Sequence, residues 1–248
     1  MKIKIKRILE ELINEYRAKH HTVTEWEEPL VGFADAKSNE IKNLKKLVVE
    51  NHFMPSDFLP DASIIISYFL PFTKTLAHTN IDGEIPSLEW ALAYQETNDM
   101  AAVLNKSLAG ILREWKYDAV VPENIGIISK DIIASRWSQR HIARAAGLGT
   151  FGLNNMLITE KGCCGRFFSI VTTVPAKPDK IITDENCLYK KKKACGLCVK
   201  KCISGALTLE YFDRKVCRDI TSKNAGIRNG ADVCGKCVVG LPCSFKCP

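Results

Sequence analysis

Apolar residues recur at helical spacing in several stretches of the chain. In residues 3–19 the apolar positions predict a helix with one buried stripe, formed by Ile5, Ile8, Leu9, Leu12, Ile13 and Tyr16. The same spacing over residues 87–116 predicts one long helix or a broken pair. Shorter helices are expected over residues 40–51 and 135–146. The first helix should therefore pack on the main domain.

Short runs of β-branched and apolar residues between these helices predict strands. The strongest covers residues 62–69 and is stopped by Pro71. Four shorter candidates cover residues 119–121, 125–128, 155–159 and 167–174. Because helices and strands interleave, we expect an α/β (α+β) domain over residues 1–180. Residues 73–86 resemble a loop, and the proline-containing segment 175–184 resembles a linker to a second domain over residues 181–248.

Composition places the chain among globular proteins. Its 248 residues are 46% hydrophobic and 25% charged, which excludes a disordered tail, a collagen-like fibre and a coiled coil. The longest nearly apolar run, residues 64–72, falls short of the roughly 20 residues of a membrane-spanning helix. The basic N-terminus leads into a charged helix and has no cleavage site. We therefore expect a cytoplasmic protein with no membrane partner.

Cysteine and charge are both concentrated near the C-terminus. None of the 11 cysteines precedes Cys163, and nine lie between Cys187 and Cys247. Clustered cysteines in a cytosolic chain are more often metal ligands than disulfides. Residues 187–248 also hold 13 Lys and Arg against 4 Asp and Glu. The run Lys190 to Lys193 is interpreted as a solvated turn, with nucleic-acid contact as the alternative.

The cysteine spacing predicts two iron–sulfur clusters. Each of the two runs contains a CxxC pair and ends on a cysteine that three residues separate from the cysteine before it. In two-cluster ferredoxins such a final cysteine ligates the other cluster and is followed by proline, as Cys247 is by Pro248. We expect two [4Fe–4S] clusters, one on Cys187, Cys195, Cys198 and Cys247, the other on Cys202, Cys234, Cys237 and Cys243. The alternative is two structural zinc sites. The remaining cysteines are interpreted as packing residues: Cys163, Cys164 and Cys217.

A glycine loop follows the helix expected over residues 135–146. Gly147, Gly149 and Gly152 match G-x-G-x-x-G, but the preceding residues are helical in pattern and no acidic residue follows about 20 positions on. A nicotinamide-binding fold is therefore not expected. The loop is either a glycine-capped helix end or bare backbone against which a flat cofactor lies. The helix before it carries three candidates for contact with a cofactor's amide or phosphate groups: Arg136, Arg140 and His141.

The sequence resembles the epoxyqueuosine reductase family, specifically its short ferredoxin-like relatives. The resemblance covers nearly the whole chain and lies in the two cysteine runs and in the segments EPLVGFADA, SIIISYFLPF, EWALAYQETNDMAAVLNKSL and RWSQRHIARAAGLGTFGLNNMLITEKG. It implies a nitroreductase-like domain, similar to that of a cobalamin-processing chaperone, followed by a two-cluster ferredoxin-like domain. It also implies a cobalamin-dependent reductase related to reductive dehalogenases, in which the clusters pass electrons to a base-off corrinoid.

The resemblance further suggests a substrate class, an electron donor and an acid. Longer family members continue into helical repeats that help to grip transfer RNA, whereas this sequence ends at Pro248, so the electrophile is carried either by tRNA or by a small molecule. Reduced ferredoxin or flavodoxin is the expected donor. An aspartate upstream of the AGLG segment protonates the leaving oxygen in the family. An ungapped count puts Ile133 there, so the nearby Asp131 is a candidate acid or a helix-capping residue.

The alternative to an enzyme is an electron-transfer module or reductive activator that serves a partner corrinoid protein.

Overall fold

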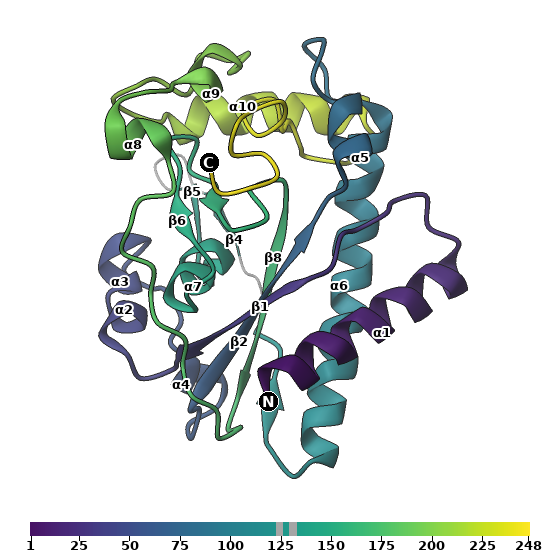
Figure 1. Ribbon diagram of the computed structural model, residues 1–248, viewed down its shortest axis with the longest axis vertical. Coiled ribbons are helices and arrows are strands. Elements are labelled where there is room, and N and C mark those ends of the chain that lie inside the picture. The colour runs from purple at the N-terminus through teal and green to yellow at the C-terminus, as the bar shows by residue number, and fades with distance from the viewer. Residues whose placement is uncertain (123–125, 129–132) are drawn as a thin grey trace.

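A four-stranded antiparallel sheet lies at the centre of the computed structural model, which describes residues 1–122, 126–128 and 133–248 (Figure 1). In spatial order the strands are β1 (Leu30–Asp35), β2 (Ile64–Pro71), β8 (Gly165–Thr172) and β3 (Ala119–Val120). Every residue of β2 is buried, because it is an inner strand and helices cover both faces of the sheet. The α/β class is confirmed, and the strand pairs are antiparallel.

Two helices cover one face of the sheet, α1 (Lys2–His20) and α6 (Leu88–Glu114) (Figure 1). The stripe predicted for α1 is buried at Ile5, Leu9 and Ile13, in one core with Leu104 of α6. The region predicted as one helix or a pair is a single helix, capped where the Ser87 hydroxyl accepts a hydrogen bond from the backbone N–H of Trp90. No described helix combines the length and apolar character that crossing a membrane requires.

The other face is covered by shorter helices: α2 (Asn39–Lys42), α3 (Leu44–Leu47), α4 (Pro55–Phe58) and α7 (Gln139–Ala145). A second apolar core lies between these helices and the sheet, and Trp137 is buried in it. The indole Nε1 of Trp137 donates a hydrogen bond of 2.9 Å to the Ser169 hydroxyl on β8. The single helix predicted over residues 40–51 is two short pieces. The helix predicted from residue 135 begins at Gln139, because β5 (Ile133–Ser135) pairs with β4 (Gly126–Ile128).

Two further elements differ from the sequence prediction. Strand β1 was not predicted, and α5 (Lys74–Thr79) occupies part of the expected loop, with the Thr73 hydroxyl accepting from the backbone N–H of Leu76. The other predicted strands are present in shortened form or shifted by a few residues. A small hairpin of β6 (Thr150–Phe151) and β7 (Leu157–Ile158) follows α7.

Residues 187–248, the cysteine-rich cap, lie across one end of the sheet (Figure 1). The cap contains α8 (Leu188–Lys192), α9 (Leu197–Lys200) and α10 (Arg214–Ile227). Hydrogen bonds attach it to the layers below: the N–H groups of Cys163 and Cys164 donate to the Ser244 carbonyl, each at 3.1 Å. The boundary predicted near residue 180 stays a prediction.

Candidate functional site

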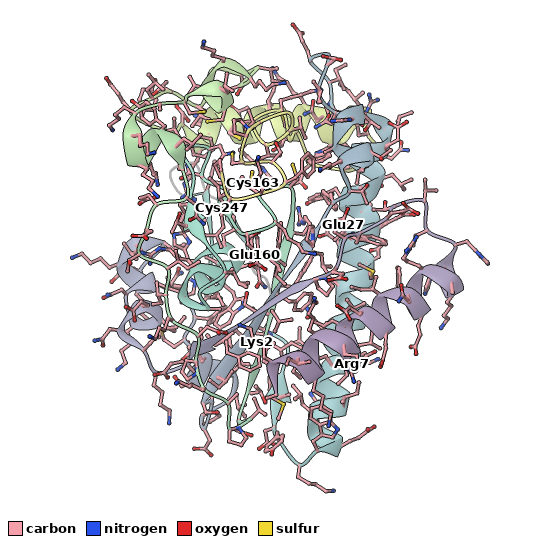
Figure 2. All side chains as sticks on the ribbon, in the orientation of Figure 1. Lys2, Arg7, Glu27, Glu160, Cys163 and Cys247 are labelled. Atoms are coloured by element: carbon pink, nitrogen blue, oxygen red, sulfur yellow. The ribbon has the colours of Figure 1, made fainter. Side chains whose placement is uncertain are left out.

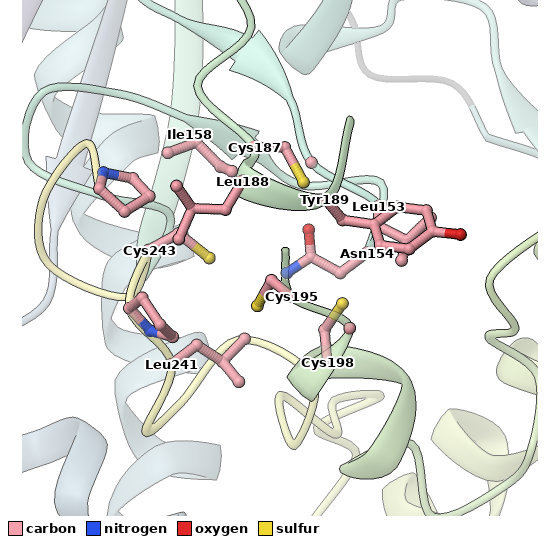
Figure 3. Close-up of a pocket in the computed structure, with 14 residues that line it drawn as sticks. Leu153, Asn154, Ile158, Cys187, Leu188, Tyr189, Cys195, Cys198, Leu241 and Cys243 are labelled. Carbon is pink, nitrogen blue, oxygen red and sulfur yellow. The ribbon is translucent and has the colours of Figure 1, made fainter. Parts of the chain in front are cut away.

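Four cysteines surround a small apolar pocket at the edge of the cap. The pocket has a volume of about 20 Å³ and is lined by Cys187, Cys195, Cys198 and Cys243, the first cysteine group. Figure 3 shows their four sulfur atoms around a common space beside Asn154. The rest of the wall includes Ile158 and Leu241, so the sulfurs face a largely apolar environment. Four convergent thiols in such a pocket match the donor set of an iron–sulfur cluster or a structural zinc ion.

The seven-residue gap between Cys187 and Cys195 is taken up by helix α8. Cys187 is the residue at which α8 begins, and Lys193 ends the helix in the left-handed conformation with φ 56°. The backbone N–H of Lys193 donates to the Tyr189 carbonyl at 2.8 Å, which turns the chain back on itself. The wide spacing therefore still brings both cysteines to one pocket.

The second cysteine group lines a larger cavity on the inner side of the cap. It consists of the four cap cysteines of this wall, Cys202, Cys217, Cys234 and Cys237; Cys163, which lies outside the cap, lines the same cavity. Cys217 belongs to the first turn of α10, whose start is fixed by the Asp213 carboxylate accepting from the backbone N–H of Val216 at 3.0 Å. The two groups are neighbours, because Cys198 and Cys237 pack in the same apolar cluster. Asn154 also bridges them: it lines the small pocket and donates to the Cys237 carbonyl at 2.8 Å.

The sequence prediction assigns Cys247 to the cluster of Cys187, Cys195 and Cys198, and Cys243 to the other cluster; that ligand assignment stays a prediction. In the structure Cys243 lines the small pocket and Cys217 lines the larger cavity. A turn brings Cys243 inward: the Ser244 hydroxyl accepts from the Leu241 N–H and donates to the Val238 carbonyl. Cys247 is exposed (labelled in Figure 2).

Cys217, which the sequence analysis interprets as a packing residue, stands alone in the sequence. Its one signal is the Asp213 cap, which predicts a helix start four residues earlier.

Burial opposes ionisation of these thiols. It raises the pKa of Cys198 to about 11, and it also raises the pKa values of Cys217, Cys234 and Cys237. Metal binding to buried thiols therefore has to displace protons. In the described ranges, no three Cys, His, Asp or Glu side chains are arranged to hold a single metal ion.

A buried ammonium group lies beside the second cysteine group. Lys236 is 3% exposed, and its Nζ donates to the carbonyl oxygens of Asn80 and Asp82 at 3.1 and 2.7 Å. Burial lowers the pKa of Lys236, while the nearby Cys234 opposes that shift. A positive charge held at this place would complement an anionic cluster on these cysteines.

The larger cavity has a volume of about 720 Å³ and lies between α6, β8, α7 and the cap. One wall carries a polar chain: the Tyr94 hydroxyl donates to the Asp232 carboxylate at 2.5 Å, and Asp232 also pairs with Arg218 at 2.9 Å. The Arg166 guanidinium lies 4.4 Å from the centre of the Tyr94 ring and donates to the Asn98 side-chain oxygen. The hydroxyl of Tyr94 is thus held beside the cavity between a carboxylate and a cation.

Two arginines line this cavity and give it positive potential. Arg140 donates to the Asn155 carbonyl at 2.5 Å, and neither Arg140 nor Arg166 forms an ion pair with a carboxylate within the described residues. Burial lowers the pKa values of both guanidinium groups. Trp90 also lines the cavity, and its Nε1 is a buried donor without an acceptor in the described part of the chain. The walls therefore offer hydrogen-bond donors to a ligand.

The candidates for cofactor contact are separated in the structure. Arg140 reaches the large cavity and Gly152 the small pocket. Arg136 instead stacks over the Phe53 ring at 3.8 Å and donates to the Asn51 carbonyl.

His141 of α7 lies beside the Phe151 ring, and its Nδ1 is 2.8 Å from the Ser138 hydroxyl. Burial, and then the charge of Arg140, lower the pKa of His141 to about 4. Asp131, the candidate acid, lies outside the described residues.

The glycine loop ends helix α7. Gly147 has φ 70°, its N–H donates to the Arg144 carbonyl, and the Leu148 N–H donates to the Ala143 carbonyl. This pattern is a glycine-capped helix end. A side chain at Gly147 or Gly149 would overlap the protein's own backbone, at the Lys180 and Ile158 carbonyl oxygens. The structure shows the helix cap, and the cofactor contact expected at these glycines stays a prediction.

Comparison with solved structures shows what this fold is similar to. An epoxyqueuosine reductase from Streptococcus thermophilus matches with a TM-score of 0.56 and 18% identity over 98% of this chain and 66% of that chain. An epoxyqueuosine reductase from Bacillus subtilis matches with a TM-score of 0.52 and 19% identity, over 97% of this chain and 66% of that chain. An epoxyqueuosine reductase crystallised with a modified tRNA-Tyr stem loop matches with a TM-score of 0.53 and 18% identity, also over 97% of this chain and 66% of that chain.

No protein-family model and no curated protein matches the sequence. The chain spans slightly less than two thirds of the length of these structural relatives. Their sequence identities of 16–19% support a statement about fold. The resemblance first found in the sequence is therefore confirmed in the fold: over nearly its whole length this chain has the fold of the epoxyqueuosine reductases.

Proposed function

We propose that this protein is an iron–sulfur reductase resembling epoxyqueuosine reductase. Two [4Fe–4S] clusters in the ferredoxin-like cap supply electrons to a cobalamin in the 720 Å³ cavity, where an epoxide-like or other electrophilic substrate is reduced. The observation that carries this proposal is that the second cysteine group forms part of the cavity wall. A cluster held there would lie beside any molecule in the cavity, as single-electron transfer to a buried acceptor requires.

Each cysteine group supplies the four thiolates that a [4Fe–4S] cluster needs. The first group would hold one cluster near the surface, and the second group would hold the other at the cavity. Because the groups are neighbours through Cys198 and Cys237, electrons have a short path from the outer cluster to the inner one. The buried Lys236 ammonium fits this assignment, because a cluster ligated by four thiolates is anionic.

The cavity walls suit a large polar cofactor. Bound cobalamin supplies a cobalt centre that accepts single electrons and, once reduced, attacks electrophiles. The Arg140 and Arg166 guanidinium groups would donate to its amide or phosphate oxygens. Reduction also consumes a proton at the leaving oxygen. The Tyr94 hydroxyl holds a proton at the cavity wall, and Asp131 remains the candidate acid suggested by the sequence.

Metal analysis of protein purified without oxygen tests this function. The protein is incubated with cobalamin, desalted, and assayed for iron, zinc and cobalt. We expect about eight iron atoms per chain, as two four-iron clusters require, together with retained cobalt. Cobalt retention should fall in Arg166→Gln with iron unchanged, because that side chain lines the cavity away from the cysteine groups.

Other results would overturn parts of the proposal. Iron without retained cobalt would make the protein an electron-transfer module that serves a partner corrinoid protein. Zinc in place of iron would remove the redox function. If iron and cobalt are both retained, turnover of an epoxyqueuosine-modified tRNA stem loop against small epoxides would identify the substrate class.

A further inference from the structure

Positive charge is concentrated beside the first cysteine group. Residues 187–209 contain six lysines and no aspartate or glutamate. Five of the six are exposed and form what we call the lysine surface: Lys190, Lys191, Lys192, Lys193 and Lys200. None of the five forms an ion pair with a described residue. Their charge is therefore not neutralised within the described chain.

The lysine surface borders the small pocket directly. Leu188 and Tyr189 of α8 and Gly196, which precedes α9, line the same pocket as the first cysteine group. The Lys193 ammonium lies 4.8 Å from the centre of the Tyr189 ring, so the charge is held against the pocket wall. Helices α8 and α9 are at the outer end of the cap (Figure 1). The positive charge thus lies where the first cysteine group comes closest to the surface.

The two cysteine groups face different environments. The second group lines the large internal cavity, and the first lies under the lysine surface. If both groups hold clusters, the outer cluster is the one that a partner can approach without entering the cavity. Electrons would then pass from the first group to the second and on to the cavity.

The chemistry of this surface favours a protein partner with an acidic face. Three exposed apolar side chains lie in the same segment, Leu197 at 42%, Ile203 at 39% and Leu209 at 47% exposure. Apolar contacts surrounded by charge are typical of transient protein interfaces, where charge complementarity accelerates encounter. Residues 187–209 contain no arginine, the side chain most used for phosphate recognition. A nucleic acid is therefore the less suitable occupant.

We propose that the lysine surface docks an acidic one-electron carrier protein and that electrons enter the chain there, through the first cysteine group. This inference rests on the proposed function, because it requires that the cysteine groups hold clusters. It adds the place of electron entry and the kind of partner that fits it.

Reduction kinetics of the iron-loaded protein test the docking. The probe is reduced flavodoxin, an acidic flavoprotein, and cluster bleaching is followed by stopped-flow absorbance at low and high salt. The test variant is K190Q/K191Q/K192Q/K193Q. The matched control removes the same charge from α2, α3 and the turn before them: K37Q/K42Q/K45Q/K46Q, all exposed.

At low salt we expect the second-order rate constant of the test variant to fall about tenfold or more, with little change in the control. The difference should shrink at high salt because screening removes steering. Equal rates for the two variants would overturn the docking surface. So would a test variant that keeps its rate with flavodoxin but loses affinity for a tRNA stem loop, which would make the surface a nucleic-acid interface.

Dithionite, a small reductant, distinguishes a protein without clusters from a protein whose clusters are intact but whose surface does not dock the carrier. It should bleach the wild type and both variants at the same rate, which shows that their clusters are intact. Wild-type protein with no bleachable cluster would overturn the proposed function itself, and electron entry with it. Normal bleaching by dithionite together with equal flavodoxin rates would overturn the docking surface alone.

Discussion

The layered part of the molecule and its cysteine-rich cap are stabilised differently. In the layers, α1, α6 and the sheet share one continuous core, and a second core lies behind the sheet around Trp137. The cap adds Cys187, Val238 and Val239 to the first of these cores, and its own apolar cluster, around Cys198, Leu207 and Leu241, is small. Asn224 is the buried residue of α10. The layers can fold by burying apolar surface, whereas the cap needs additional stabilisation.

Helix length accentuates this difference. Helix α6 spans 27 residues, whereas α8 and α9 span five and four. Isolated helices shorter than about 12 residues are marginal in water. Small domains without a sufficient core generally depend on metals or cross-links. We therefore expect that metal binding by the cysteines stabilises the fold of the cap, in addition to any redox role.

The largest effect should come from removing iron. Chelation under reducing conditions should abolish hydrogen-exchange protection in α8, α9 and the turn around Cys243, because cluster binding and folding of the cap are coupled. Protection in most of α6 and in β2 should persist, since the main core is formed largely by α1, α6 and the sheet, to which the cap adds Cys187, Val238 and Val239. Hydrogen exchange measured by mass spectrometry checks both. Equal loss in both regions would show that the cap and layers fold as one unit.

The next largest effect should follow from changing one ligand. Cys217→Ser should lower iron by about four atoms per chain, because it removes one thiolate of the second group. Cys247→Ser is the matched control and should retain full iron, since that side chain is exposed. Iron assays with electron paramagnetic resonance distinguish the clusters. The reverse result, with iron lost only in the control, would restore the ligand grouping expected from sequence.

A smaller effect on the free energy of unfolding should distinguish a buried leucine of the main core from an exposed leucine of the cap. Leu104→Ala on α6 should lower the free energy of unfolding by about 2–5 kcal/mol, because Leu104 is fully buried in the main core. Leu209→Ala in the cap should change it by less than about 0.5 kcal/mol, because Leu209 is 47% exposed. Thermal unfolding of the iron-loaded proteins measures both. A comparable loss at Leu209 would mean that the cap contains more apolar stabilisation than its contacts indicate.

The smallest expected effect is a pH dependence of the layers. The pKa of His141 is about 4 in the folded chain, against about 6.5 when unfolded. Between these values only the unfolded chain binds the proton, so stability falls as pH drops from 6.5 to 4. The loss between pH 7 and 5 is at most about 2 kcal/mol. Melting temperatures at both pH values should differ less in His141→Gln than in the wild type. An unchanged difference would exclude His141 as the source.

The fold was predictable where burial imposed a regular spacing of apolar residues along the sequence. The stripe of α1, the long α6 and the apolar β2 all followed from their spacing, because each buries one face or both in the core. Strand β1 was missed because LVGFAD is short and includes a glycine, so its identity depends on pairing with β2. The short helices α2 and α3 also depend on tertiary contacts, and their residues alone predicted one longer helix.

The sequence predicted most of the cysteines that line the site, and their assignment to two clusters stays a prediction. Runs of cysteine predict ligands, and seven of the eight expected ones line the two cavities. Which cysteines converge depends on how the chain between the runs folds back, and there α10 brings in Cys217 from outside both runs. The cavity itself arises between α6, β8 and the cap, which are far apart in the sequence. No pattern in the sequence indicated that the Arg166 guanidinium would lie over the Tyr94 ring.

Helix α8 links ligand spacing to partner choice. It fills the gap that widens the first cysteine run, and the same few residues carry four of the five charges on the lysine surface. A chain with the usual two-residue spacing would lack those charges. If the lysine surface docks the electron donor, the residues between two cysteines set the charge that the donor meets, and exchanging them between two such chains would change donor preference while leaving every thiol in place.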